Sequence, residues 1–314
     1  MKDVMLRICC LRGTMDQLLR LITLVLSMLV FASINSALVL AQNEKEEPLN
    51  PEWVRRDVQG VAVLMKLTPI ENRNIEVLKK QLKDQWSVDE DWLGFGAKHV
   101  NIGKGYGYSS VYIDVLTFEN KIAYYEIGVR VSGSRNWEEY RQKIIDAWKQ
   151  SGGPKYTEKE HELTYQRKYD NVFAAYYQVV AGDLGGMKAV SVPAELKEAY
   201  DYLISPLNNS YVGEGICGLD GPVLEGKTSI DALINANRVD LITNVLRGYN
   251  PGGRIFAAIA LLRMKREGLR LDPDVTATLN KVAHLNVPVT TCFGCLVFTG
   301  RKAKSVVKQF LEEW

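Results

Sequence analysis

Three cysteines beyond the N-terminal segment could carry covalent chemistry. Cys217 lies in Ile-Cys-Gly-Leu-Asp-Gly-Pro, whereas Cys292 and Cys295 lie in Thr-Thr-Cys-Phe-Gly-Cys. Glycines in both segments let the backbone bend, so the segments could bring Cα atoms within the roughly 4.4 to 6.8 Å that a disulfide requires. An odd number of cysteines leaves one thiol over. We therefore predict a disulfide between Cys217 and either Cys292 or Cys295, with the remaining thiol free.

The same cysteines allow two other kinds of site. Cys292 and Cys295 form a C-x-x-C pair, which can switch between dithiol and disulfide when a helix N-terminus lowers the pKa of its first thiol. The residues after the pair, Leu-Val-Phe, predict an extended strand and not the helix that a redox pair needs. Three thiolates and His284 could instead form a Cys₃His zinc site, but there is no second C-x-x-C and no paired histidine. We expect no metal site and no cofactor.

A glycine-rich stretch at residues 94–107 invites comparison with phosphate-binding loops. Lys98 stands where a Walker-type loop needs its first glycine, and Gly105 follows Lys104 where that loop needs Ser or Thr. A strand, and not a helix, is predicted to follow. We interpret the stretch as a turn-rich loop that leads to a strand at Ser110.

The residues that serve in common catalytic motifs are scattered. The three histidines, His99, His161 and His284, lie far apart in the sequence. His161-Glu162 lacks the second histidine of a zinc-protease helix, because Tyr165 stands four residues after His161. The sequence contains no G-x-S-x-G element for a serine nucleophile. We assign no catalytic residue from the sequence.

Residues 1–41 have the composition of a secretory signal. The uncharged residues 21–43, which begin Leu-Ile-Thr-Leu-Val-Leu, follow four basic side chains: Lys2, Arg7, Arg12 and Arg20. Val39 and Ala41 provide acceptable residues at positions −3 and −1 of a signal peptidase site. We predict cleavage after Ala41, and initiation at Met15 would leave the same site.

The signal sets the expected location of the protein. A cleaved signal predicts a secreted or periplasmic protein, in which disulfides persist. If the signal is retained, residues 21–41 could anchor the chain, since about 20 apolar residues can span a bilayer. Contact with a membrane is expected only through that segment. Residues 42–52 are polar, contain Pro48 and Pro51, and are interpreted as a linker.

Charge is balanced overall but unevenly distributed after residue 41. Residues 42–246 hold 24 basic and 30 acidic side chains, whereas residues 247–314 hold 11 and 5. The overall balance does not favour nucleic acid as a partner. The basic tail part favours an anionic ligand or a protein, bound by a basic surface on the C-terminal helices: Arg254, Arg263, Lys265, Arg266 and Arg270.

Residues 53–187 are expected to form an α+β domain, an antiparallel sheet with helices on one face. Apolar runs and alternation predict a buried strand at residues 61–67, a β-hairpin at residues 111–131 and a strand at residues 163–169. Apolar stripes predict helices at residues 75–86 and 137–148.

Residues 188–314 are expected to form an all-α subdomain of helical hairpins with a C-x-x-C tail. Apolar stripes predict one helix that starts near Pro193 and four more between Ile230 and Val282. The run from Asn250 to Leu262 has a proline near the helix start, an arginine, then small and aliphatic residues. This run resembles the second helix of a HEAT-like repeat, and the resemblance covers about residues 228–284. It implies helical hairpins that bury their apolar faces against one another.

These features favour an exported, non-enzymatic binding or scaffold protein. The alternative is an exported enzyme, either a hydrolase or a thiol oxidoreductase, whose site is assembled from residues far apart in the sequence. An open surface lined by Tyr and Arg would favour binding. A pocket that joins titratable groups with shifted pKa values would favour the enzyme.

Overall fold

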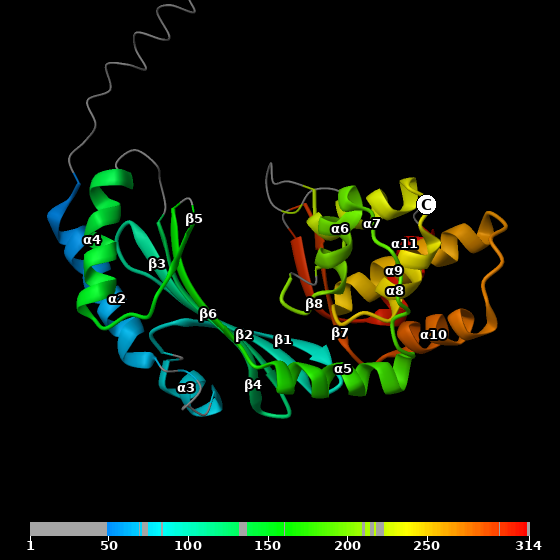
Figure 1. The fold of residues 1–314 in the computed structure, drawn as a ribbon, viewed down its shortest axis with the longest axis horizontal. Coiled ribbons are helices and arrows are strands. Elements are labelled where there is room, and N and C mark those ends of the chain that lie inside the picture. The colour runs from blue at the N-terminus through cyan, green and yellow to red at the C-terminus, as the bar shows by residue number, and fades with distance from the viewer. Residues whose placement is uncertain are drawn as a thin grey trace, which may run out of the picture. The chain divides into compact units, whose positions relative to one another are not determined.

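An antiparallel sheet precedes a group of helices along the chain in the structure, a computed structural model (Figure 1). The structure describes residues 49–68, 70, 75–82, 84–131, 137–159, 161–208, 211–213, 217, 223–294 and 296–312. The predicted signal, its cleavage site and residues 42–48 of the predicted linker lie outside these residues. Residues 51–314 form one compact unit.

Helix α2 (Pro51–Leu67) opens this unit. Its proline stands at the helix start, where the missing N–H has no partner to lose. The buried residues recur at helical spacing along one face: Asp57, Gly60, Val61, Leu64 and Met65. The strand predicted at residues 61–67 is therefore wrong, because that apolar run is the second half of an amphipathic helix.

Six strands form one antiparallel sheet in the order β1-β2-β3-β4-β6-β5. The strands are β1 (Ser87–Gly94), β2 (Ala97–Gly105), β3 (Ser109–Phe118), β4 (Lys121–Val131), β5 (Thr157–Lys159) and β6 (Glu162–Lys168). The hairpin predicted at residues 111–131 is confirmed as β3 and β4, and the strand predicted at residues 163–169 is confirmed as β6.

One face of this sheet is apolar and lies under three helices. Its buried residues come from β2, β3 and β4: Val100, Ile102, Val111, Ile113, Val115, Ile127 and Val129. Helix α2 packs on β3 and lies beside α4 (Trp137–Gln150) (Figure 1). Helix α3 (Ile75–Leu82) is tied to β1 by the Lys79–Glu90 ion pair. The helix predicted at residues 137–148 is thus confirmed, and the one predicted at residues 75–86 is confirmed as far as Leu82, where α3 ends.

The glycine-rich stretch at residues 94–107 is not the predicted loop. It contains the end of β1, a tight turn and the whole of β2. Phe95 and the glycines on either side of it have φ values of 55°, 82° and 82°, which a turn between two strands requires and glycine adopts without strain. Val100 and Ile102 point to the apolar face. The alternation of apolar and other residues that is typical of a strand is therefore present in β2, but glycines interrupt it.

Helices α5 (Asp170–Leu184) to α10 follow the sheet. The others are α6 (Ala194–Ile204), α7 (Glu225–Asn235), α8 (Val239–Leu246), α9 (Pro251–Arg266) and α10 (Pro273–His284). Helix α9 is the central one, because every residue from Pro251 to Leu261 is buried. The helices predicted between residues 190 and 285 are confirmed, and the described chain has no strand between Ile230 and Val282.

The tail adds a second, two-stranded sheet to this helical region. Strands β7 (Pro288–Phe293) and β8 (Leu296–Lys302) form an antiparallel hairpin, and α11 (Ala303–Glu312) follows it. Buried residues of α11, α9 and α5 share one apolar cluster with Leu93 and Leu116 of the large sheet. The fold is α+β, as predicted.

Candidate functional site

The other face of the large sheet carries polar residues in register across five strands. Each member pairs with the next on the neighbouring strand: Asp89, Asn101, Asp114, Glu126 and Gln166. We call these five residues the carboxylate row. Paired strands lie about 4.8 Å apart, so the row forms a continuous line across the sheet. Its members on β1, β2 and β6 are exposed, which opens the row to solvent.

Two carboxylates lie directly opposite each other within the row. Asp114 of β3 pairs with Glu126 of β4, and like charges at such a position destabilise a sheet. Tyr112 and Tyr124 compensate by donating hydrogen bonds from their hydroxyls to Glu126, at 2.7 and 2.9 Å. Burial, reinforced by Glu126, raises the pKa of both tyrosines, so they remain neutral donors.

The remaining partner of the row is a histidine. Nε2 of His99 lies 2.7 Å from Oδ1 of Asp114, and Asp91 pairs with His99 on the neighbouring strand. Burial by itself lowers the pKa of His99, but Asp114 and then Asp91 outweigh it, so the pKa of His99 is raised. Burial raises the pKa of Asp91, which His99 opposes and Asp89 supports.

We expect stability to depend on the protonation of His99. Its pKa is raised in the folded state, so its stabilising contribution is complete below the ordinary histidine pKa of about 6.5 and is lost as pH rises through the folded-state pKa. Urea unfolding of the wild-type protein should therefore give a free energy that falls as pH rises from 6 to 9.

A His99→Gln variant should show a smaller fall over the same pH range, and His284→Gln serves as the control because His284 is exposed on α10. An identical pH profile for wild type and His99→Gln would show that the His99–Asp114 pair does not favour the charged imidazole. The pH range lies above the ordinary pKa of aspartate, about 3.9, which limits the contribution of Asp91.

An arginine closes one side of this polar face. Arg130 donates to Glu162 at 3.0 Å, and its guanidinium lies 5.5 Å from the centre of the Tyr112 ring. A carboxylate oxygen of Glu162 also lies 2.9 Å from the Tyr112 hydroxyl, so Glu162 and Glu126 share its one donor. The face is thus lined by Tyr, Arg and carboxylate side chains.

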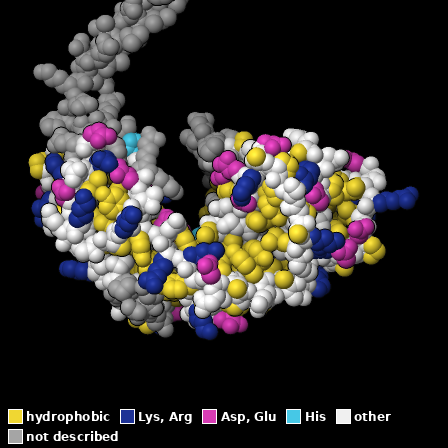
Figure 2. All heavy atoms as spheres, in the orientation of Figure 1, with side chains coloured by type: hydrophobic (Ala, Val, Ile, Leu, Met, Phe, Trp, Pro, Cys, Tyr) yellow, Lys and Arg dark blue, Asp and Glu magenta, His cyan; other side chains and the backbone are white. Residues whose placement is uncertain are grey.

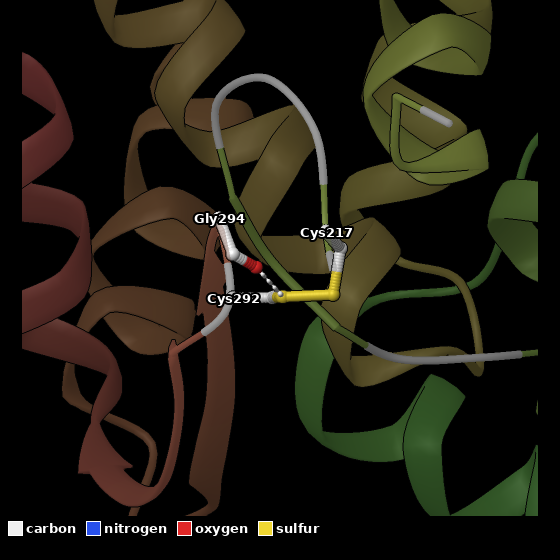
Figure 3. The surroundings of a disulfide bond; sticks show 3 residues. All are labelled: Cys217, Cys292 and Gly294. Carbon is white, nitrogen blue, oxygen red and sulfur yellow. Dashed lines mark hydrogen bonds between the residues drawn. A yellow bond between two sulfur atoms is a disulfide. The ribbon is translucent and has the colours of Figure 1, made fainter. Parts of the chain in front are cut away.

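The structure joins two of the three cysteines. Cys217 and Cys292 form a disulfide with Cα atoms 5.6 Å apart, and it closes a loop of 75 residues. Figure 3 shows the bond beside the β7–β8 turn, where the Cys292 sulfur also contacts the carbonyl of Gly294. The prediction is confirmed in its first form, Cys217 with Cys292. Cys295 lies outside the described residues.

The basic residues predicted on the C-terminal helices do not form one surface. Arg263 and Arg266 donate to the carbonyls of Phe310 and Leu311, so both cap the end of α11. Lys265, Arg266 and Arg270 are exposed. On the face drawn in Figure 2, basic and acidic side chains are interspersed.

Arg254 was predicted on that surface and is buried instead, with 1% of its surface exposed. The prediction is wrong for this residue because α9 is surrounded on all sides by other elements. Nη2 of Arg254 donates to the carbonyl of Leu93 at 2.8 Å, and the guanidinium lies 5.1 Å from the centre of the Phe95 ring. Burial lowers the pKa of Arg254, opposed by Tyr176. Arg254 therefore fastens the β1–β2 turn to α9.

A shallow hollow of about 650 Å³ lies on α6, apart from the carboxylate row. Its lining residues are Ala194, Lys197, Glu198, Asp201, Tyr202, Ser205, Asn208 and Glu225. Burial raises the pKa of Tyr202 to about 12. Lys197 and Asp201 pair with each other across one helical turn. The hollow holds neither a histidine nor a cysteine, and its carboxylates are Glu198, Asp201 and Glu225.

Within the described ranges, no group of three or more His, Cys, Asp or Glu side chains could hold a metal ion. Over the same part of the chain, no helix has the length and hydropathy needed to cross a membrane. Comparison with protein-family models, curated proteins and solved structures finds no match for this chain. The site must therefore be interpreted from its own geometry.

Sequence reasoning missed the carboxylate row. Each strand shows only polar residues alternating with apolar ones, as any strand with one solvated face does. The signal that could have revealed the row is the register of the β3–β4 hairpin, because a turn at residues 119–120 places Asp114 near Glu126. The partners from β1, β2 and β6 could not be aligned without the structure.

Proposed function

We propose that this chain is an exported binding or scaffold protein, and that the carboxylate row binds a positively charged segment of its partner. The observation that carries the proposal is the direct opposition of Asp114 and Glu126 on a half-buried, open sheet face. Like charges at that position destabilise a sheet unless other groups offset them, and a cationic partner would add to the offset that Tyr112, Tyr124 and His99 provide.

The chemistry of the row specifies the kind of partner. Its two opposed carboxylates accept hydrogen bonds, and its exposed Asn101 and Gln166 can both donate and accept. Lysine or arginine side chains of an extended segment could place their charges between Asp114 and Glu126 and relieve their repulsion. The acidic excess of residues 42–246 would add long-range attraction for such a segment.

Export is part of the proposal. The Cys217–Cys292 disulfide is compatible with an extracellular or periplasmic location, because such bonds persist in oxidising compartments. The basic segment at the N-terminus and the uncharged run after it support a secretory route. Secretion or retention in a periplasm would follow from the type of cell.

The test uses a fluorescent oligolysine peptide as the probe and fluorescence anisotropy as the measurement. We expect the wild-type protein to bind oligolysine and not to bind oligoglutamate. Its affinity for oligolysine should fall as the salt concentration rises. The isosteric pair Asp114→Asn and Glu126→Gln should weaken binding about tenfold, which corresponds to about 1.4 kcal/mol. The same pair removes the His99–Asp114 contact as well as a like-charge contact, so its urea midpoint is measured to show that the variant is folded under the conditions of the binding assay.

The double variant Glu198→Gln and Asp201→Asn is the matched control, because it also removes two negative charges, both from carboxylates that are exposed on α6. It should bind oligolysine as the wild type does. Equal affinities for the control and the Asp114/Glu126 variant would show that attraction comes from net charge and would overturn the proposal.

The enzymatic alternative retains one specific observation, the His99–Asp114 pair beside Asp91. A hydrolase could use His99 as a general base oriented by Asp114. The thiol oxidoreductase form has less support, because Cys292 is bonded to Cys217 and not to Cys295. Loss of a hydrolytic activity in His99→Gln, with oligolysine binding unchanged, would favour the hydrolase.

A further inference from the structure

The β7–β8 hairpin exposes an apolar segment directly after its turn. Leu296, Val297 and Phe298 are 61%, 49% and 46% exposed. Successive side chains of a strand point to opposite faces, so three exposed residues in a row mean that both faces of β8 are uncovered there. This segment, which we call the hairpin tip, is therefore a two-sided projection and not one flat face.

The other sheet has edges of a different kind. Its edge strand β1 carries Asp89, Glu90 and Asp91, and its opposite edge strand β5 has only three residues. Charges and short length are the usual protections of a sheet edge. The hairpin tip has neither a charge nor a helix over it, which indicates that its exposure is used.

The disulfide holds the hairpin tip in place. Cys292 pairs with Val297 across the hairpin, and Cys217 bridges to Gly294 at the turn. The Cys217–Cys292 bond thus ties the turn to the chain that precedes α7 (Figure 3). A tip fixed in this way cannot fold back to cover its own apolar side chains.

Cations follow the hairpin tip along the chain. Lys302 ends β8, and Lys304 and Lys308 are exposed one helical turn apart on α11. Lys308 also pairs with Glu312 at 3.6 Å, whereas Arg301 is engaged by Gln309. The nearest of these lysines lies four residues beyond Phe298, about 13 Å along an extended strand.

We infer that the hairpin tip inserts into an anionic lipid surface and that these lysines meet the lipid head groups. An apolar projection exposed on two faces loses water from both when it enters the acyl boundary, which a contact with one flat protein face would not achieve. Lysines behind such a tip are attracted by anionic lipids. The inference is independent of the carboxylate row and of whether residues 21–41 are retained.

The test uses the protein as isolated after export, sedimented with vesicles of phosphatidylcholine alone or mixed with phosphatidylglycerol. Wild-type protein should sediment with the mixed vesicles and be released by salt. Phe298→Asp should weaken this binding about tenfold, the effect of keeping one aromatic side chain out of the apolar layer. The double variant Lys302→Glu and Lys304→Glu should remove the preference for phosphatidylglycerol.

Val179→Asp is the matched control, since Val179 is an exposed apolar residue on α5 with 44% of its surface accessible. All variants share the same N-terminus, so any contribution of residues 1–48 is common to them. Urea unfolding checks the fold of the variants, and a midpoint equal to that of the wild type shows that Phe298→Asp is folded.

Three results would overturn the inference. The first is wild-type protein that stays in solution with both kinds of vesicle, and the second is equal loss of binding in Val179→Asp and Phe298→Asp. The third is self-association of the wild type in sedimentation velocity that Phe298→Asp abolishes, because the hairpin tip would then be covered by a second copy of the chain.

Discussion

Replacement of both Cys217 and Cys292 by serine is expected to lower the free energy of unfolding by about 4 kcal/mol. The disulfide closes a loop of 75 residues, and a cross-link of that span restricts the unfolded chain by about this amount in the chain-entropy model. The loop contains α7 to α10, so the bond restrains the unfolded form of most of the helical region. The native contacts of β7 should change little, because Cys292 is buried and serine is close to it in size.

Thermal unfolding with and without reductant measures this effect. The wild-type melting temperature should fall on reduction, whereas that of the double serine variant should not respond. Peptide mapping of the unreduced protein should recover the Cys217 and Cys292 peptides linked. A wild-type melting temperature that is unchanged by complete reduction would contradict the expectation. A disulfide between Cys292 and Cys295 would contradict it too and would favour the redox interpretation.

Asp57→Ala is expected to destabilise the protein by about 3 kcal/mol or more. Asp57 of α2 has no exposed surface, and its carboxylate accepts from the backbone N–H groups of Gly107, Tyr108 and Ser109 and from the Ser109 hydroxyl. Alanine would leave three N–H donors without this partner, and the cost of an unsatisfied buried donor, about 1 to 3 kcal/mol, applies fully to the buried N–H of Ser109 and in part to the two half-buried ones. The turn between β2 and β3 would lose its attachment to α2.

Urea unfolding measures this change, with Asp170→Ala as the control. Asp170 is an exposed carboxylate whose contact is an ion pair with Lys168 at 3.2 Å, so its removal should leave the urea midpoint unchanged. Asp57→Asn should lie between alanine and wild type, because one side-chain oxygen remains while the amide nitrogen cannot accept. An Asp57→Ala variant as stable as the control would mean that water replaces the carboxylate at this turn.

Asp57 and Arg254 show which part of the fold lay beyond sequence reasoning. Both are charged, and a charged residue on a helix is ordinarily assigned to its solvated face. Asp57 is buried because a turn 50 residues later presents donors to it, and Arg254 is buried because Leu93, 161 residues earlier, supplies an acceptor. Neither partner can be found from spacing within the helix.

Local patterns determined the elements with strong periodicity. The helices from α6 to α10, the β3–β4 hairpin and the Cys217–Cys292 alternative could all be predicted, because apolar spacing, turn residues and loop-borne cysteines act over short stretches of chain. The prediction of a strand at residues 61–67 was wrong because it too used a short stretch of chain. A window that begins at Val61 contains only half of the apolar stripe of α2.

The sequence by itself determined an α+β chain with an acidic front part and a basic tail part, and it predicts a secretory signal at the N-terminus. Only the tertiary structure decided that five polar side chains form one row and that three apolar ones project beyond a disulfide. The physical reason is register: strands from distant parts of the chain place residues opposite one another through backbone hydrogen bonds, which no single strand specifies.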